Sequence, residues 1–180
     1  MDTRLLYTIL VALVAVGRLV ELRIAARNRQ RLLARGGVEV APGHYRWMVL
    51  NHTAFLIACP LEVWLLGRPF LAPLAAVMVL LVVLATALRY WVIRTLDGRW
   101  TTRIVVLPGT PPVVGGPYRW LHHPNYLAVC TEIAALPLVH TAWLTALVFS
   151  VLNALILWVR IRAEEGALKR LTPYDEAFAR

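Results

Sequence analysis

The sequence predicts an all-α integral membrane protein: one membrane-embedded domain over residues 1–180 with about five transmembrane helices. Of the 180 residues, 59% are hydrophobic and 16% are charged, whereas a soluble domain carries about a quarter charged residues. The mean hydropathy is +0.64. Long apolar runs recur along the chain, and the basic residues behind the formal net charge of +9 gather at the ends of these runs. This pattern is typical of a polytopic membrane protein.

Five apolar runs correspond to the predicted helices: residues 5–20, 48–66, 70–93, 126–139 and 143–159. At about 1.5 Å per residue, the first run nearly spans a bilayer core, with Arg18 extending towards the headgroups, and the fourth run is short. A basic extension of the first run ends at Gly36-Gly37. Residues 97–114 are rich in proline and glycine and predict a loop. No small-residue cleavage site follows the first run, so we expect a retained helix rather than a signal peptide.

The arginines orient these helices. They are concentrated in residues 23–46, in residues 94–122 and from residue 160 onward, whereas the other side has only Arg4 and Arg68. Cytoplasmic loops carry an excess of basic residues. Five spans place all three basic segments on one face, and four or six spans do not. We therefore expect the N-terminus outside and the long loop and C-terminal tail in the cytoplasm.

Composition also argues against several other classes of protein and site. A net charge of +9 can indicate nucleic-acid binding, but its clustering at helix ends favours a membrane protein without a nucleic-acid partner. Cys59 and Cys130 fall within apolar runs, so we expect buried, inert thiols. His122 and His123 are adjacent and would point about 100° apart on a helix. Since no cysteine or carboxylate cluster completes a site, we expect no metal.

One segment stands out between the apolar runs: residues 115–126, Gly-Gly-Pro-Tyr-Arg-Trp-Leu-His-His-Pro-Asn-Tyr. Polar and conformationally restricted residues between hydrophobic spans are costly unless they line a cavity or lie at the membrane surface. Pro117 and Pro124 fix the backbone at two points, and the two glycines permit a sharp turn. The segment therefore predicts a shaped loop that leads into a helix starting near Asn125 and forms a binding site.

Glu164 and Glu165 follow the fifth run, just as this loop precedes the fourth. If the fourth and fifth helices form a hairpin, the two glutamates meet the loop at the cytoplasmic mouth of the bundle. The alternative is a solvated helix end with ordinary i,i+4 pairs such as Arg160–Glu164. The composition of the loop favours the site.

Three further polar residues lie within or near the apolar runs, where a charge costs about 2.5–3.5 kcal/mol. His52 and Glu62 are expected to make polar contacts between helices. Glu132 lies two helical turns from Asn125 and is a candidate to face the pocket.

Residues 116–126, followed after one helical hairpin by Arg-Ile-Arg-Ala-Glu-Glu at 160–165, resemble the isoprenylcysteine carboxyl methyltransferase family. The likeness covers the C-terminal half, about residues 99–180. Members of this family are integral membrane enzymes that transfer a methyl group from S-adenosylmethionine to lipid-borne acceptors. Their fold has no Rossmann sheet, in agreement with the absence of a glycine-rich dinucleotide turn from this sequence.

The resemblance implies roles for particular residues. The cofactor, S-adenosyl-L-methionine, would contact Val113, Tyr118, His123, Pro124, Asn125, Tyr126 and Glu164. Arg160 would hold the acceptor, and His123 is the candidate to take a proton from it. The family usually has arginine where this chain has His122, so we assign position 122 no role.

The implied reaction is O-methylation of a lipid acceptor dissolved in the bilayer. The acceptors considered are a long-chain phenol or pyrone polyketide, a prenylcysteine carboxylate and a phospholipid headgroup. The short chain is typical of bacterial members, which places the protein in the inner membrane with its site facing the cytoplasm. Two other functions are considered: a membrane reductase that uses NADPH and resembles sterol reductases, and a non-enzymatic membrane scaffold. The oligomeric state is left open.

Overall fold

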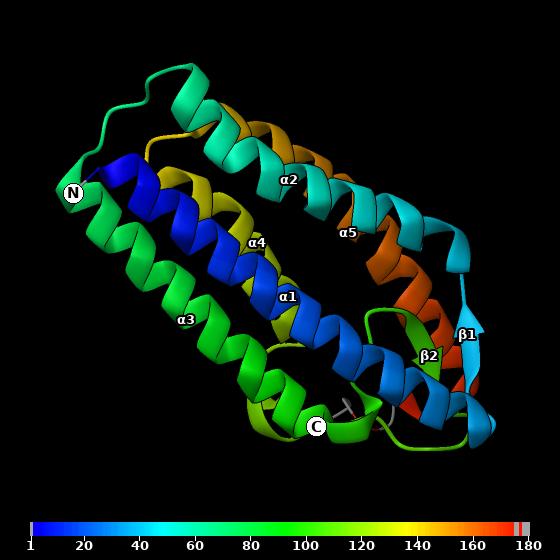
Figure 1. The fold of residues 1–180 in the computed structure, drawn as a ribbon. Helices are drawn as coiled ribbons and strands as arrows, with labels where there is room; N and C mark the ends of the chain where they lie inside the picture. The colour runs from blue at the N-terminus through cyan, green and yellow to red at the C-terminus, as the bar shows by residue number, and fades with distance from the viewer. Residues whose placement is uncertain (1, 175–176, 178–180) are drawn as a thin grey trace.

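The computed structural model describes residues 2–174 and 177, and these residues form a bundle of five helices (Figure 1). The helices are α1 (Thr3–Ala34), α2 (Tyr45–Leu65), α3 (Ala72–Leu96), α4 (Pro124–Leu138) and α5 (Trp143–Leu171). The all-α prediction is confirmed, and each predicted apolar run lies within one helix or extends only one or two residues beyond it.

Four helices, α1, α2, α3 and α5, are long and apolar enough to cross a membrane. Large apolar side chains such as Leu13, Leu80 and Leu155 are exposed on their outer faces, as expected where a helix contacts lipid rather than water. The protein is therefore a multi-pass membrane protein. At 15 residues, α4 is only about 22 Å long, shorter than a hydrocarbon core of about 30 Å.

The short helix α4 is level with its neighbours at one end of the bundle and recessed at the other. At the level end, His140 Nε2 lies 3.2 Å from Thr3 Oγ1, and the Thr141 hydroxyl donates to the Pro69 carbonyl at 2.6 Å. Its partner in the hairpin, α5, has 29 residues against 15 in α4. Because α4 stops inside the bundle, the end opposite Thr3 has room for a loop and a pocket.

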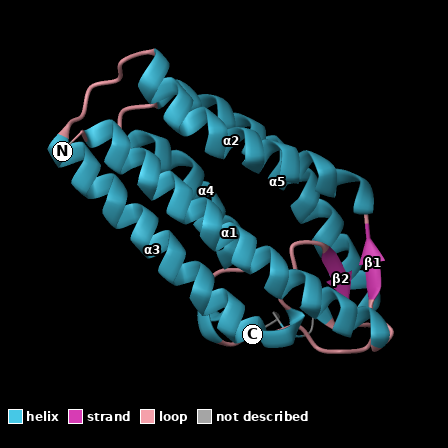
Figure 2. Ribbon diagram, in the orientation of Figure 1, coloured by secondary structure: helices cyan, strands magenta, loops and turns pink. Residues whose placement is uncertain are grey.

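This opposite end also carries a two-stranded ribbon that the sequence analysis did not predict (Figure 2). Strand β1 (Val38–Val40) pairs antiparallel with β2 (Ile104–Val106), with Val38 opposite Val106. The Gly109 amide donates to the Leu171 carbonyl at 2.8 Å and so connects the same loop to the end of α5. Three segments that are far apart in sequence, each rich in arginine, therefore lie together at one end of the molecule.

Two arginines fix the ribbon through Glu39 of β1. Arg29 Nε donates to Glu39 Oε2 at 2.8 Å, and Arg103 Nη1 donates to Glu39 Oε1 at 2.7 Å. Burial opposes ionisation of this carboxyl, but the hydrogen bonds and charges of the two arginines outweigh it, so the pKa of Glu39 lies below its usual value. The ribbon is thus tied to α1 by ionic contacts.

The interior of the bundle is packed where α2 meets α4. Phe55, Cys59 and Val63 of α2 form one cluster with Ile133 and Leu136 of α4. The buried position of Cys59 agrees with the sequence prediction. The prediction for Cys130 was wrong, because this thiol is exposed on α4. An apolar run does not reveal which face of its helix points towards lipid.

The intramembrane glutamate of α2 stabilises the start of α5. Glu62 accepts hydrogen bonds from the backbone amides of Leu144 and Thr145, at 3.2 and 2.6 Å, and pairs with Arg68 at 2.7 Å. These amides have no partner within their own helix, so Glu62 acts as a cap supplied by another helix. The expectation of a polar contact between helices is correct for this residue.

Candidate functional site

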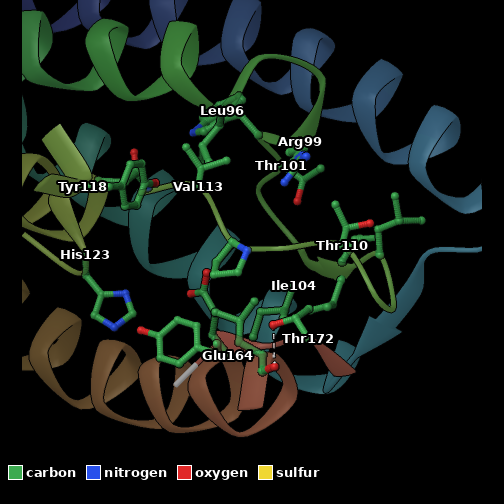
Figure 3. Close-up of a pocket in the computed structure, with 18 of the residues that line it drawn as sticks. Leu96, Arg99, Thr101, Ile104, Thr110, Val113, Tyr118, His123, Glu164 and Thr172 are labelled. Carbon is green, nitrogen blue, oxygen red and sulfur yellow. Dashed lines mark hydrogen bonds between the residues drawn. The ribbon is translucent and has the colours of Figure 1, made fainter. Parts of the chain in front are cut away.

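A pocket occupies the recess left by α4 (Figure 3). Its walls come from the end of α3, the loop between α3 and α4, the first turn of α4 and the last turns of α5. Most residues singled out from the sequence line this pocket: Val113, Tyr118, His123, Asn125, Tyr126, Arg160 and Glu164. Pro124 does not line it. This proline is buried as the first residue of α4, where the missing amide hydrogen has no cost.

The predicted hairpin of α4 and α5 brings the two sequence motifs together. The Tyr126 hydroxyl donates to the Glu164 carboxylate and accepts a hydrogen bond of 2.9 Å from Arg160 Nε. His123 Nε2 lies 2.8 Å from Glu165 Oε1. Both glutamates thus contact residues of the central motif, so this end of α5 is more than a solvated helix end with pairs along its own surface.

The turn before α4 depends on a glycine. Gly116 has φ of +57°, and a Cβ there would lie 2.4 Å from the Thr95 hydroxyl of α3. Any larger residue would therefore push the 3₁₀ turn Gly116–Arg119 away from α3. This turn carries Tyr118 into the pocket wall (Figure 3). Burial raises the pKa of Tyr118, and the Glu164 carboxylate adds to the effect, so its hydroxyl remains a hydrogen-bond donor at neutral pH.

The first turn of α4 offers both an acceptor and an aromatic surface. Asn125 Oδ1 is buried and has no hydrogen-bond partner among the described residues. A buried acceptor without a partner costs free energy unless a ligand or water supplies a donor. The rings of His123 and Tyr126 are stacked, with centroids 5.2 Å apart. The turn can therefore bind a planar group and a hydrogen-bond donor together.

Arg160 lies where α5 meets α2. Its side chain is buried, and besides Tyr126 it contacts the sulfur of Met48, with Nη1 at 3.7 Å. A guanidinium in a poorly solvated position attracts anionic or oxygen-bearing groups more strongly than one in water. Arg162, one half-turn further on, is exposed and lies over the ring of Trp158 at 4.0 Å.

Glu132 does not face the pocket, contrary to the sequence prediction. It is buried further along α4 and pairs with Arg89 of α3 at 2.6 Å and with Arg18 of α1 at 3.2 Å. A spacing of two turns from Asn125 placed it on the correct face of the helix but below the pocket. The prediction that Arg18 extends towards the headgroups was also wrong, because its charge is paired with Glu21 and Glu132 inside the bundle.

Several lining residues were missed from the sequence. They include Leu32 of α1, the segment Arg99, Trp100 and Thr101, and the β2 residue Ile104. The polar stretch that opens the long loop was visible in the sequence, but only the ribbon pairing brings it over the pocket. His122, to which we assigned no role, also lines the pocket.

The described residues contain no group of three or more histidine, cysteine, aspartate or glutamate side chains arranged to hold a metal ion.

Comparison with known proteins identifies a family for this chain. The model of the isoprenylcysteine carboxyl methyltransferase (ICMT) family matches residues 77–170, which contain α4, most of α5 and both motifs. The chain belongs to the ICMT family. Membership suggests methyltransferase activity, and the resemblance noted in the sequence is confirmed.

Two relatives align with almost the whole chain. An uncharacterized protein YpbQ of Bacillus subtilis (strain 168) is 37% identical over 165 residues, which cover 91% of this chain and 97% of the relative. An uncharacterized protein of Haemophilus influenzae is 30% identical over 157 residues, covering 87% of this chain and 91% of the relative. No solved structure matches.

Proposed function

We propose that this ICMT-family protein is an S-adenosylmethionine-dependent methyltransferase that methylates an oxygen of a lipid acceptor dissolved in the membrane. One observation carries the proposal: Tyr126 of the central motif is hydrogen-bonded to both Arg160 and Glu164 of the second motif. The two segments on which the family resemblance rests therefore form one site, beside a pocket at the end of a membrane-embedded bundle.

The residues of the pocket fit the cofactor chemically. S-adenosylmethionine offers amino and ribose donors, a planar adenine and a cationic sulfonium. Glu164 and the unpartnered Asn125 Oδ1 are acceptors for its donors. The faces of Tyr118 and Tyr126 suit the adenine and the cation, and the loop backbone near Val113 supplies further polar groups. When bound, the cofactor supplies a methyl group activated by the sulfonium charge.

Arg160 is proposed to orient the acceptor. Its Nε is held by the Tyr126 hydroxyl at 2.9 Å, which fixes the plane of the guanidinium. A fixed, planar guanidinium directs a carboxylate or phenolate oxygen better than a flexible ammonium. Orientation of this kind is the main contribution that a protein can make to an in-line displacement.

His123 and Glu165 are proposed to handle the acceptor's proton. A carboxylate acceptor is already ionised and needs no base, whereas a phenol has a pKa near 10 and does. The contact of 2.8 Å between His123 Nε2 and Glu165 Oε1 orients the imidazole at the edge of the pocket. This pair supports a long-chain phenol or pyrone over a prenylcysteine carboxylate as the acceptor.

The distribution of arginines indicates on which side of the membrane the pocket opens. All three arginine-rich segments lie at the pocket end of the bundle, and basic segments favour the cytoplasmic side. We propose that the protein resides in a bacterial inner membrane with the pocket facing the cytoplasm. The soluble cofactor would then enter from the cytoplasm and the acceptor from the bilayer.

The deciding experiment uses membranes from cells that overproduce the protein, incubated with S-adenosylmethionine labelled in its methyl group. We expect label in the lipid extract. Membranes with the Glu164→Gln variant should lose this signal, and membranes with the Arg162→Lys variant, changed outside the pocket, should retain it. No enzyme-dependent label in lipid or protein, together with oxidation of added NADPH, would favour the reductase. Neither signal would favour the scaffold.

A further inference from the structure

Below the pocket, four charged side chains from three helices form a closed ring. Arg18 and Glu21 come from α1, Arg89 from α3 and Glu132 from α4. Arg18 lies 2.5 Å from Glu21 and 3.2 Å from Glu132, and Arg89 lies 3.9 Å from Glu21 and 2.6 Å from Glu132. Positive and negative side chains alternate around this ring, so its net charge is zero.

The ring lies at a fixed depth below the pocket on both α3 and α4. Arg89 precedes Leu96 by seven residues on α3, and Glu132 follows Asn125 by seven residues on α4. Leu96 and Asn125 both line the pocket. Seven residues are about two helical turns or 10 Å, and they return to the same helix face. A shift of either helix along its axis would therefore move a pocket residue and break the Arg89–Glu132 contact together.

The same spacing holds on α1. Glu21 precedes Asn28 by seven residues, and Asn28 Nδ2 donates to the Trp100 carbonyl at 2.9 Å. Trp100 belongs to the loop that lines the pocket. Each helix of the ring thus connects, two turns further on, with one part of the pocket wall.

Stability alone does not account for the ring. Glu21, Arg89 and Glu132 are all buried, at 5–6% exposure, and well-packed apolar residues often replace a buried ion pair without loss of stability. The ring also leaves hydrogen-bonding capacity unused, since Arg89 Nε and Glu21 Oε1 are buried without partners among the described residues. Such atoms cost free energy. Directional pairing that specifies register is the best-attested use of buried charges.

We propose that the ring sets the axial register of α1, α3 and α4, and that Arg89 and Glu132 are positioning residues for the pocket. A slip of one helical turn, about 5.4 Å, would separate each pair between helices. With the ring intact, Asn125, Leu96 and Trp100 are held at the same depth. The inference rests on the proposed function only where its test measures cofactor binding and turnover.

The test separates register from stability with two variants. Glu132→Gln leaves a buried arginine charge uncompensated and should lower the melting temperature and cofactor affinity together. The double variant Arg89→Met, Glu132→Leu is neutral and apolar, with Arg18 and Glu21 still paired on α1, and should regain the melting temperature. We expect its Kd for S-adenosylmethionine to remain raised by about tenfold and its turnover to remain about a hundredfold low, as for a displacement of about 1 Å.

The matched control is Tyr90→Met, Cys130→Ser, which changes exposed neighbours on the same two helices, keeps an acceptor for the Asn153 amide and should match the wild type. Spin labels on exposed sites of α1 (Val16) and α4 (Leu127) report register without any ligand. Their distance should change in the double variant and not in the control. If the double variant does not fold, Arg89→Lys, which keeps the charge but shortens the reach, should show the affinity loss at a native melting temperature.

A double variant with wild-type label distance, cofactor affinity and turnover would overturn the proposal. If the wild-type protein itself binds no S-adenosylmethionine, the proposed function fails, and the spin-label distances alone then decide whether the ring sets register.

Discussion

The hydroxyl of Tyr126, on the first turn of α4, donates a hydrogen bond to the carboxylate of Glu164 on α5. The same hydroxyl accepts from Arg160 Nε at 2.9 Å. A single phenol therefore connects the residue proposed to hold the cofactor with the residue proposed to hold the acceptor. Because both sites use one hydroxyl, changes at Tyr126 should affect both.

Tyr126→Phe tests this connection. The variant keeps the ring that stacks on His123 but removes the hydroxyl, so Arg160 and Glu164 lose a shared partner. Hydrogen bonds to charged groups contribute about 1.5–3 kcal/mol, so we expect cofactor affinity and turnover both to fall by at least about tenfold. Calorimetric titration with S-adenosylmethionine measures the cofactor affinity, and a labelled-methyl assay measures the turnover. Tyr90→Phe, at an exposed site on α3, is the control, and equal behaviour of both variants would contradict the shared role.

Glu164→Gln should weaken cofactor binding more than acceptor binding. The neutral amide keeps the size of the side chain but loses the charge that accepts from Tyr126 and is proposed to accept from the cofactor. We expect a loss on the order of 1.5–3 kcal/mol in the binding free energy of S-adenosylmethionine. Titration of the wild type and of the variant with S-adenosylmethionine measures this loss. An unchanged Kd would leave Glu164 as a charge at a helix end without a role in binding.

The sequence was sufficient to predict the helices and the meeting of the two motifs. Apolar runs and their arginine-rich ends define where the four long helices can cross, because hydrocarbon tolerates few other sequences. A hairpin of the last two helices then has to bring Tyr126 near Glu164. Hydropathy gives the length of a run and not the direction of each side chain, which is why Cys130 was expected inside and is exposed.

Contacts between distant segments could not be predicted from the sequence. Each strand of the ribbon has three residues, too few for an alternating pattern to be recognised. The pairing of Val38 with Val106 is what brings Arg103 over the pocket. Arg18 and Glu132 were each interpreted alone, and only the packing of three helices shows that they neutralise each other.

The proposed orientation in the membrane predicts where reporters fused to the chain will be active. Arg68 lies at the end opposite the pocket, in the loop between α2 and α3. An alkaline phosphatase fused after Arg68 should be active, because that enzyme folds only outside the cytoplasm, and one fused at Gly109 in the long loop should be inactive. Fluorescent protein fusions should give the reverse pattern. A cytoplasmic reading at Arg68 would invert the proposed location of the pocket.

Glu39 predicts a pH-dependent contribution to stability. Its pKa is lowered in the folded protein, so the contribution is complete above the ordinary value of about 4.3 and is lost as the pH falls through the lower folded value. Glu39→Gln should therefore lower the melting temperature in detergent at pH 7, and the difference from the wild type should shrink below about pH 4. Asp97→Asn, at an exposed site, is the control, and a difference independent of pH would contradict the ionic role.

Arg160→Lys tests whether the planar guanidinium orients the acceptor. Lysine keeps the positive charge but has no fork and no Nε donor in the place that contacts Tyr126. The acceptor oxygen would lose its fixed direction, and a misplacement of about 1 Å can cost roughly a hundredfold in rate. Since Glu164 retains its bond from Tyr126, the Kd for S-adenosylmethionine should change much less than turnover.

The contrast with Arg162 makes this prediction decisive. Arg162 stands on the same helix, two residues away, but is exposed and packed on Trp158, so Arg162→Lys should retain wild-type turnover in the labelled-methyl assay. An ordinary Arg160–Glu164 helix pair would contribute only about 0.2–0.5 kcal/mol and would tolerate lysine equally well. If both lysine variants turn over at the wild-type rate, Arg160 does not orient the acceptor.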